Sequence, residues 1–247
     1  MQQKICAIIF IIYLIFPFSL KAQENYDITY EDAAMKFGVL ASPNGIGLFY
    51  RNSTPLQNKY SWCFDLSFTG VKQIKEKQVL NQRMVNTTPY IYGKVNRLYA
   101  LRPMLGLSKE LAEKQNKNSV GVHAFALLGP TLGFLKPNYV NVEYFDPTNP
   151  NVVISKSVRY NPEIYRFDQI TGYSPFTHGM NELKLVGGLS FKLGTEFNWG
   201  YYSSDFKSIE VGMLIDWFPS RPELFHFVQN KIVYSSFYIS FALGKNY

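Results

Sequence analysis

Hydrophobic and polar residues alternate along most of this chain, in segments long enough for β-strands. Residues 60–68, 183–199 and 231–247 show the pattern most clearly. Successive side chains of a strand point to opposite faces, so each segment predicts a strand with one apolar and one polar face. The last apolar stripe ends on Tyr247, the C-terminal residue. This arrangement is typical of the closing strand of an outer-membrane β-barrel, which turns its apolar face to lipid.

Eight alternating segments predict eight strands, at residues 35–41, 46–51, 60–68, 97–108, 120–134, 183–199, 209–217 and 231–247. The first two are joined by Ser42-Pro43-Asn44-Gly45, in which Asn-Gly favours a tight turn. The later connections alternate between short and long. An even number of antiparallel strands places both termini on the periplasmic side and the long connections on the cell surface. The sequence therefore predicts an all-β protein formed by a single antiparallel transmembrane barrel of eight strands, with long extracellular loops.

The longest connection, residues 135–181, leaves ten strands as an alternative. It contains five prolines and is longer than a plain connection in a compact domain. Residues 139–145 and 152–160 alternate well enough to form a further hairpin. That hairpin would either extend the barrel to ten strands or pair above the membrane.

The N-terminus predicts a cleaved secretory signal peptide. Lys4 precedes an apolar run at residues 5–20, and Lys21-Ala22-Gln23 resembles a cleavage site. Cys6 lies at the start of the run, so no lipid anchor is implied. Three regions follow from this interpretation: a signal peptide at residues 1–22, a periplasmic segment at 23–34 and an outer-membrane barrel at 35–247. Cys63 is then the single cysteine of the mature chain, and we expect it to fill space on an inward strand face.

Composition supports export to the outer membrane. After the signal no run of about 18 apolar residues remains, which excludes an inner-membrane helical protein. Mean hydropathy is −0.10, as expected when strands hide half of their positions from lipid. The formal net charge of +7 could attract nucleic acid, but an exported chain meets lipopolysaccharide phosphates first, and nucleic acid is set aside. Expected partners are outer-membrane lipid, lipopolysaccharide and, during insertion, the barrel-assembly machinery, for which Phe241, Leu243 and Tyr247 form the expected signal.

Short motifs occur in order along most of the mature chain. They are Phe37-Gly38, Asn44-Gly45-Ile46-Gly47-Leu48-Phe49, Tyr92-Gly93-Lys94-Val95-Asn96, Leu132-Gly133-Phe134-Leu135-Lys136-Pro137, Ser174-Pro175-Phe176-Thr177, Asn181-Glu182-Leu183-Lys184, Glu210-Val211-Gly212 and Asp216-Trp217-Phe218-Pro219. In these motifs the chain resembles an uncharacterised outer-membrane β-barrel family of Bacteroidota-type Gram-negative bacteria. The resemblance implies an outer-membrane barrel and implies no catalytic residues.

Charged residues on the polar strand faces predict a network inside the barrel. Its expected members are Lys36, Arg51, Asp65, Arg102, Lys184, Lys192, Glu196, Glu210 and Asp216. The two signs nearly balance, and an eight-stranded barrel has room for little besides side chains. We therefore expect a plugged lumen, with a narrow solute or ion pore as the alternative.

The long loops carry two candidate binding surfaces. Residues 70–96 place five cations against Glu76 and would attract anions such as lipopolysaccharide phosphates, or form a solvated loop without a ligand. These cations are Lys72, Lys75, Lys77, Arg83 and Lys94. The loop at 135–181 is rich in aromatic residues, which suit protein or glycan contact or packing of the loop onto itself. They are Tyr139, Tyr144, Phe145, Tyr160, Tyr165, Phe167, Tyr173 and Phe176.

Candidate chemistry is sparse. His178 follows Ser174 and Asp168 in the long loop, where a hydrolytic site is conceivable. We expect His123 to be hydrogen-bonded and to fill space on the inward face of the fifth strand, and His226 to lie at the membrane interface. Metal signatures, Gly-rich phosphate loops and cysteine pairs are absent from the sequence, so no cofactor is predicted. The sequence thus predicts a non-enzymatic structural or interaction protein, in one form an accessory subunit of a larger outer-membrane complex, with a pore or a lipid- or peptide-hydrolysing enzyme as alternatives.

Overall fold

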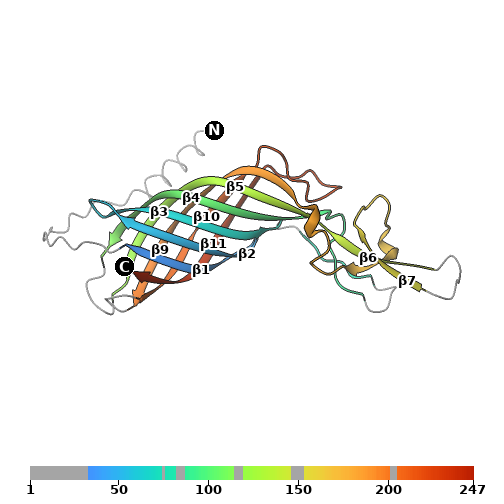
Figure 1. The fold of residues 1–247 in the computed structure, drawn as a ribbon, viewed down its shortest axis with the longest axis horizontal. Coiled ribbons are helices and arrows are strands. Elements are labelled where there is room, and N and C mark those ends of the chain that lie inside the picture. Colours follow the sequence, from blue (N-terminus) through green and yellow to red (C-terminus); the bar gives the residue numbers. More distant parts are fainter. Residues whose placement is uncertain (1–32, 74–75, 82–86, 114–118, 146–152, 201–204) are drawn as a thin grey trace, which may run out of the picture. The chain divides into compact units, whose positions relative to one another are not determined.

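Eight strands form a closed antiparallel barrel in the computed structural model (Figure 1). The structure describes residues 33–73, 76–81, 87–113, 119–145, 153–200 and 205–247, so the expected signal peptide and cleavage site lie outside the described residues. The barrel strands are β1 (Ala34–Ser42), β2 (Gly45–Pro55), β3 (Tyr60–Val71), β4 (Asn96–Ala112), β5 (Gly121–Pro137), β9 (Lys184–Gly200), β10 (Asp205–Trp217) and β11 (Val233–Asn246). The predicted eight-stranded barrel is confirmed.

The barrel closes where the first strand pairs with the last. The order around the wall is β1-β11-β10-β9-β5-β4-β3-β2. In the closing register Ala34 lies opposite Asn246 and Ala41 lies opposite Ile239. Closure leaves no edge strand, so the backbone groups of the wall hydrogen-bond to one another, as a lipid environment requires.

The first hairpin depends on Gly45. Its φ of 154° is a backbone conformation that L side chains rarely adopt. A Cβ at this position would lie 2.1 Å from the carbonyl oxygen of Gly70 on β3. Glycine is therefore required both by the turn and by the close approach of the neighbouring strand.

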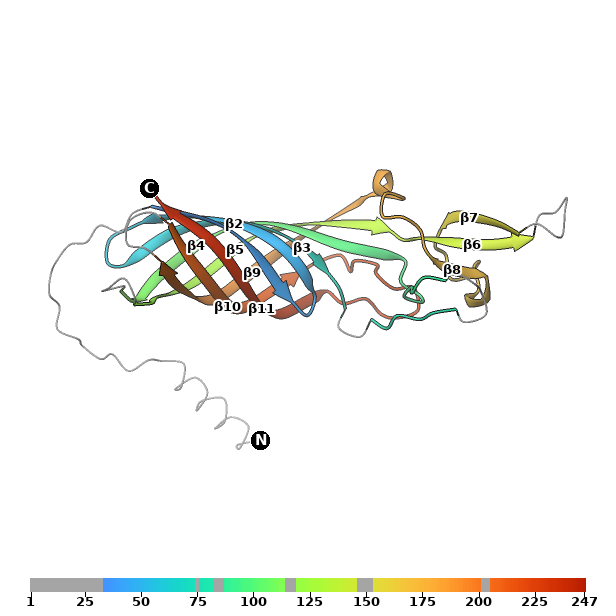
Figure 2. The same ribbon diagram turned by 90° about the horizontal axis from the view of Figure 1, so that it is seen from below.

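A second sheet follows β5 outside the barrel (Figures 1 and 2). It contains β6 (Tyr139–Phe145), β7 (Val153–Arg159) and β8 (Ile170–Tyr173), in the order β7-β6-β8. The 3-10 turns η1 (Phe167–Gln169) and η2 (Met180–Glu182) flank β8. The hairpin left open by the sequence therefore forms, but it pairs with β8, and the ten-stranded alternative is wrong.

The chain leaves the barrel wall at Pro137 and Asn138. Pro137 ends β5 and has no N–H with which to continue the ladder. The backbone N–H of Asn138 donates to Val95 O at 2.8 Å, and its side-chain amide donates to Lys94 O at 2.7 Å. Strands β6, β7 and β8 form a lobe together with the described residues at 76–81, 87–95 and 160–183, which pack around them. We call it the β6–β8 lobe.

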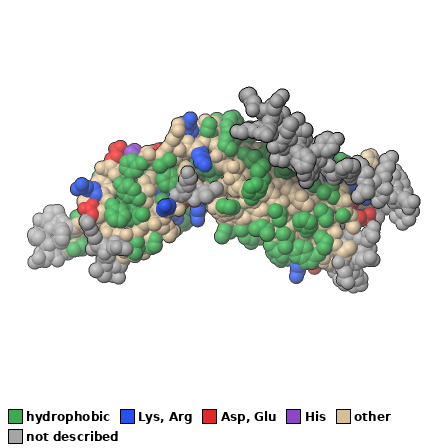
Figure 3. All heavy atoms as spheres, turned by 180° about the vertical axis from the view of Figure 1, so that it is seen from behind, with side chains coloured by type: hydrophobic (Ala, Val, Ile, Leu, Met, Phe, Trp, Pro, Cys, Tyr) green, Lys and Arg blue, Asp and Glu red, His purple; other side chains and the backbone are tan. Residues whose placement is uncertain are grey.

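The barrel is apolar on its outer face and encloses buried charged side chains. Exposed hydrophobic side chains lie on the outward faces of its strands, for example Leu185 at 70% and Phe237 at 74% relative exposure, and they cover much of the barrel surface in Figure 3. Charged side chains such as Arg51, Lys192 and Glu210 are buried inside. A barrel made for water places its apolar face inward. No helix among the described residues is long and apolar enough to span a bilayer.

Candidate functional site

Six charged residues meet across the lumen and form what we call the central charge cluster: Lys36, Arg51, Asp65, Lys192, Glu196 and Glu210. They come from five strands, β1, β2, β3, β9 and β10, because alternation on each strand turns them all to the inner face. Each has a side chain at most 8% exposed. The cluster crosses the interior from one wall to the other.

Arg51 is the centre of this cluster. Its guanidinium lies 2.9 Å from Asp65 Oδ2, 2.8 Å from Glu210 Oε1 and 3.5 Å from Glu196 Oε2. Arginine suits this position because its planar fork presents several donors to carboxylates in fixed directions. One cation on β2 thus holds carboxylates from three other strands.

The two lysines complete the balance of charge. Lys36 bonds Glu196 and lies 2.8 Å from Glu210 Oε1. Lys192 lies 3.1 Å from Asp65 Oδ2 and 3.6 Å from Glu210 Oε2. The cluster therefore holds three cations and three carboxylates, all paired, which is the condition under which buried charge is tolerated.

Aromatic rings fill the space around the cations. The Arg51 guanidinium lies 4.1 Å from the centre of the Phe125 ring, and Lys192 Nζ lies 4.8 Å from the Phe49 ring and 5.1 Å from the Tyr238 ring. These rings belong to a buried apolar group with Leu40, Cys63, Met104, Leu127, Leu214 and Ala242. Cys63 is thus buried beside Ser53, with 3.4 Å between Sγ and Oγ.

A second ion pair lies further along the lumen. Arg102 donates from Nε and Nη2 to the two carboxylate oxygens of Asp216, each at 2.7 Å, and from Nη1 to Thr69 Oγ1 at 2.8 Å. Ser190 Oγ donates to Asp216 at 2.5 Å and is itself hydrogen-bonded to Thr131. Beyond this ion pair lies a buried apolar group, which consists of Val71, Leu98, Ala100, Leu135, Phe218, Leu224 and Tyr234. The lumen is therefore occupied by paired charges and apolar side chains in succession.

Lys184 is the exception among the predicted lumen charges. It is the first residue of β9 and is exposed. Its register partner is Leu135, two positions from the end of β5. Alternation along β9 assigns Lys184 to the inner face of the barrel. At this point, however, the strand has reached the rim, so the predicted place of Lys184 in the charge network is wrong.

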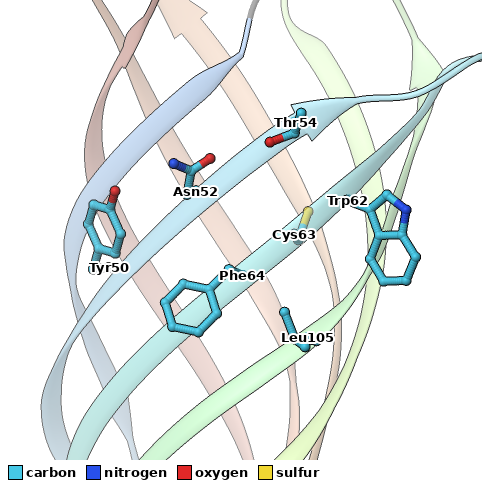
Figure 4. Close-up of a pocket in the computed structure, with 7 residues that line it drawn as sticks. All are labelled: Tyr50, Asn52, Thr54, Trp62, Cys63, Phe64 and Leu105. Atoms are coloured by element: carbon cyan, nitrogen blue, oxygen red, sulfur yellow. The ribbon is translucent and has the colours of Figure 1, made fainter.

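The outer wall carries a shallow groove of about 490 Å³. Figure 4 shows Tyr50, Asn52 and Thr54 along β2 beside Trp62 and Phe64 of β3. Asn52 donates its amide to the hydroxyl of Tyr247 at 2.9 Å. The lining side chains other than Cys63 lie on the outward faces, so the groove is a feature of the outer wall.

The β6–β8 lobe has its own core. Tyr90, Val140, Val142, Tyr160 and Ile170 are buried together. Tyr160 Oη accepts from the N–H of Gly93 at 3.0 Å, and Tyr173 Oη accepts from the N–H of Ile91 at 3.1 Å. Burial raises the pKa of all three phenols, Tyr90, Tyr160 and Tyr173. The loop before β4 is therefore fixed to the long loop, although the two are distant in sequence.

An exposed group of rings lies where the segment between β10 and β11 meets this lobe. Tyr92 stacks on Phe227 with 5.8 Å between ring centres and meets Phe167 edge-on at 6.4 Å. Tyr92, Phe167 and Phe227 are 42%, 39% and 58% exposed, and Val228 is 57% exposed. We call these four residues the aromatic patch. Three separate loops contribute to it, and Phe227 and Tyr92 were not among the residues that the sequence singled out for binding.

The structure separates the five predicted loop cations. Lys94 is 3% exposed, and its Nζ lies 2.5 Å from Glu76 Oε1; burial lowers its pKa although the bond to Glu76 opposes this. Lys94 is therefore a structural cation inside the lobe, and its expected place on an anion-attracting surface is wrong. Lys72 and Lys77 are exposed, while Lys75 and Arg83 lie outside the described residues.

The histidines are not arranged for hydrolysis in the part of the chain that is described. His178 packs its ring on Tyr139, with 5.9 Å between centres, and Ser174 Oγ donates to Asn141 Oδ1 at 2.7 Å. No bond joins His178 to Ser174 or Asp168 there. His226 Nε2 lies 3.0 Å from Glu163 Oε1 in the lobe, and His123 lies opposite Glu196 in the β5–β9 register. The described residues hold no group of three side chains suited to a metal ion.

The long-loop aromatics divide between the two uses that the sequence left open. Tyr160 is buried at 3% exposure, whereas Tyr144, Phe167 and Phe176 are exposed.

Phe241, Leu243 and Tyr247 lie outward on or after β11 and are 46%, 58% and 59% exposed. An assembly role for these three residues stays a prediction.

The fold and the interior together define a closed eight-stranded barrel of the outer-membrane type. No family model matches the chain, and neither does any curated protein. Similar solved structures include Ail, the attachment invasion locus protein of Yersinia pestis, with 10% identity over 89% of this chain and 100% of Ail and a TM-score of 0.39. The structure of Ail in complex with the heparin analogue sucrose octasulfate is similar at 11% identity, with the same coverage and TM-score.

Neisserial surface protein A is similar at 8% identity over 87% of this chain and 95% of that protein, with a TM-score of 0.37. Likeness at this level does not extend to binding or activity.

Proposed function

We propose that this protein is an integral barrel of the outer membrane, closed to solutes, which displays the β6–β8 lobe on the cell surface for binding a protein partner. The observation that carries the proposal is the reversal of polarity across the barrel wall. Hydrophobic side chains face outward, and paired charges face inward. In water this arrangement would expose a large apolar surface, whereas a bilayer covers it.

The filled interior supports a non-conducting barrel. Eight strands enclose a space that side chains can fill completely. Here Arg51, Lys192 and their carboxylates occupy it together with Phe49, Phe125 and Tyr238. A solute would have to separate ion pairs that have no access to water, at a cost of several kcal/mol for each charge.

The lobe supports an interaction role. The aromatic patch is exposed, and its residues are held by the buried core of the lobe and by contacts among three loops. Rigid, exposed aromatic rings supply much of the binding energy at protein interfaces and lose little entropy on binding. Inclusion in a larger outer-membrane complex, as an accessory subunit, is the specific form of this proposal.

Conductance measurement tests the closed lumen. The purified protein is inserted into planar bilayers, and insertion is checked by protease protection of the barrel in matched vesicles. We expect inserted protein to give no steps of constant conductance. Regular steps from the inserted wild type would contradict the proposal and establish the pore alternative.

Copurification tests the interaction role. A tag in the turn near Asn58 leaves Tyr247 free, and native membranes are extracted with mild detergent. We expect a stoichiometric partner with the wild type, loss of that partner with Phe167→Ser/Phe227→Ser, and its retention with Val153→Ser, which removes from β7 a hydrophobic residue whose exposure lies between those of Phe167 and Phe227. A lone barrel in every sample would contradict the interaction role.

Hydrolysis of lipid or peptide panels that is lost in His178→Ala would instead support the enzyme alternative.

A further inference from the structure

Two cations face each other on the outside of the barrel wall where β4 and β5 reach the lobe. Arg97 and Lys136 are direct partners in the β4–β5 register. Their neighbours Leu98 and Leu135 are buried in the lumen, so Arg97 and Lys136 lie on the opposite, outward face. Like charges placed directly opposite on neighbouring strands repel each other and destabilise the pair.

Neither cation has a carboxylate partner among the residues that the structure describes. The Arg97 guanidinium lies 4.6 Å from the centre of the Tyr173 ring. Lys136 Nζ lies 4.9 Å from the Phe176 ring and donates to the carbonyl oxygen of His178 at 2.7 Å. The nearby carboxylate of Glu182 is engaged by Tyr139 and Arg159. The contacts of the two positive charges in the described structure are thus rings, a carbonyl and the Tyr173 hydroxyl, none of which is an anion.

The position of this pair along the strands fits the head-group level of a membrane. Further along the outward face of β4, away from the β6–β8 lobe, lie Tyr99 and then hydrophobic residues, of which Leu105 is 59% exposed. Tyr99 stacks with Phe68 and meets Phe176 edge-on, each with 6.1 Å between ring centres, as in an aromatic belt. Arg97 lies two residues beyond Tyr99, which is about 7 Å further along a strand. On the face drawn in Figure 3, Lys and Arg side chains gather where the hydrophobic barrel surface ends.

We propose that Arg97 and Lys136 form a binding site for a phosphate group of an outer-leaflet lipid. Arg97 is half-buried and offers its guanidinium fork to phosphate oxygens, while Lys136, 4% exposed beneath Phe176, adds the second charge. The phosphate neutralises the repulsion between the two strands, and the acyl chains of the same lipid lie along the hydrophobic stripe of β4 and β5. The inference rests on the proposed function, because the membrane defines the depth of the site.

Lipid titration followed by native mass spectrometry of the full protein in detergent tests the site. The probes are lipid A carrying its phosphate groups and the same lipid after dephosphorylation. We expect the wild type to bind the phosphorylated lipid in preference. The variant Arg97→Gln/Lys136→Gln should bind it at least about tenfold more weakly, because charge-assisted hydrogen bonds are lost. Equal binding of both lipids by the wild type, or unchanged binding by the double variant, would overturn the proposal.

Two further variants separate a lipid site from a purely structural contact. Lys109→Gln is the matched control, since Lys109 lies on the outward face of the same strand, 5.2 Å from the Tyr60 ring, and faces Ala124 where Lys136 faces Arg97. We expect it to bind lipid A as the wild type does. The exchange Arg97→Lys/Lys136→Arg keeps both charges and should keep the phosphate preference. Loss of the preference in the exchange variant, with the lobe still protected from protease, would contradict charge recognition.

A third arm identifies the source of the phosphate. Inorganic phosphate is added as a competitor, and we expect little displacement of lipid A, because the lipid also gains contacts along the hydrophobic stripe. Complete displacement at low concentration would assign the site to a free anion and overturn the lipid assignment. If the wild type inserts into bilayers without conductance but shows no phosphate preference, this inference fails and the proposed function stands. Failure to insert would contradict the proposed function itself.

Discussion

Arg51 on β2 and Glu210 on β10 form an ion pair across the lumen, with 2.8 Å between Nη1 and Oε1. Their side chains are 1% and 0% exposed, so the pair has no access to water. Because the same guanidinium also contacts Asp65 and Glu196, it joins four barrel strands at a single point. The stability of the barrel should therefore depend on this arginine more than on any exposed charge.

Replacement of Arg51 by Met should destabilise the barrel strongly. The three carboxylates of the central charge cluster would then share two lysines, and buried charge without a partner costs about 3–5 kcal/mol. Urea unfolding of the folded protein in lipid vesicles, followed by tryptophan fluorescence, measures this change. The control is Lys59→Met: Lys59 pairs with Glu113 at 3.9 Å, but both side chains are about half exposed, at 61% and 47%. That exposed pair should contribute at most about 1 kcal/mol, and equal effects of both variants would contradict the importance of burial.

Arg102 and Asp216 should show strong energetic coupling. Their two bonds of 2.7 Å are made in the buried interior, so removing either partner leaves the other charge unpaired. We expect Asp216→Leu and Arg102→Met each to cost about 3–5 kcal/mol, and the double variant to cost clearly less than their sum. A double-mutant cycle measured by urea unfolding gives the coupling. Additive effects would show that the two residues act independently.

Two glycines of the barrel wall should differ in how strongly their replacement by alanine destabilises the barrel. A Cβ at Gly106 would lie 2.0 Å from the carbonyl oxygen of Ala126 on the neighbouring strand, whereas a Cβ at Gly187 would have nothing within 4 Å. Gly106→Ala should therefore lower the free energy of unfolding by about 1–3 kcal/mol through overpacking. Gly187→Ala should change it by less than about 0.5 kcal/mol. Thermal unfolding, read as the gel shift between folded and heated protein, compares the two, and a larger loss for Gly187→Ala would contradict the packing.

The β6–β8 lobe should loosen in alkali before the barrel does. Burial raises the pKa of the phenols of Tyr90, Tyr160 and Tyr173 above the ordinary value of 10.0. A group with a raised folded-state pKa stabilises the fold below its unfolded value and loses that contribution as pH rises further, so the loss should begin above about pH 10. Limited proteolysis of the lobe against pH, with tyrosinate absorbance in parallel, measures it.

Tyr90→Phe supplies the control for the alkaline transition. The hydroxyl of Tyr90 is buried and has no hydrogen-bond partner among the residues that the structure describes, so its removal should cost little at neutral pH. The variant should move the onset of proteolysis to higher pH. An unchanged onset in Tyr90→Phe would show that this phenol does not contribute to the transition.

The strands themselves could be predicted because alternation is a local property. The segments expected at residues 60–68 and 209–217 lie within β3 and β10, and their charged residues Asp65, Glu210 and Asp216 are buried inside. The prediction failed where a strand passes the rim. Alternation assigns Lys184 to the inward face, yet its side chain is exposed, because alternation predicts the face of a residue and not where the lumen ends.

The cations of the loops could not be assigned from the sequence. Lys94 belongs to a basic segment, yet it is buried against Glu76 because Asn138 and Phe225 bring two other loops over it. Conversely, Arg97 and Lys136 are 39 positions apart in numbering and became neighbours only through the β4–β5 register. A net positive charge predicts attraction of anions, but the place of binding depends on which cations remain unpaired after folding.

The sequence by itself determined where the eight barrel strands lie, the face that each side chain occupies and the polarity of the wall, because period-two alternation is a property of each strand separately. Only the tertiary structure decided which charges meet. Arg51 finds Glu210, and Arg97 finds Lys136, through the registers that close the barrel. It also decided that the hairpin of β6 and β7 pairs with β8, because Pro137 ends the ladder of β5 and the segment before β4 binds the chain beyond it. These outcomes depend on contacts between distant segments, and a local pattern carries no record of such contacts.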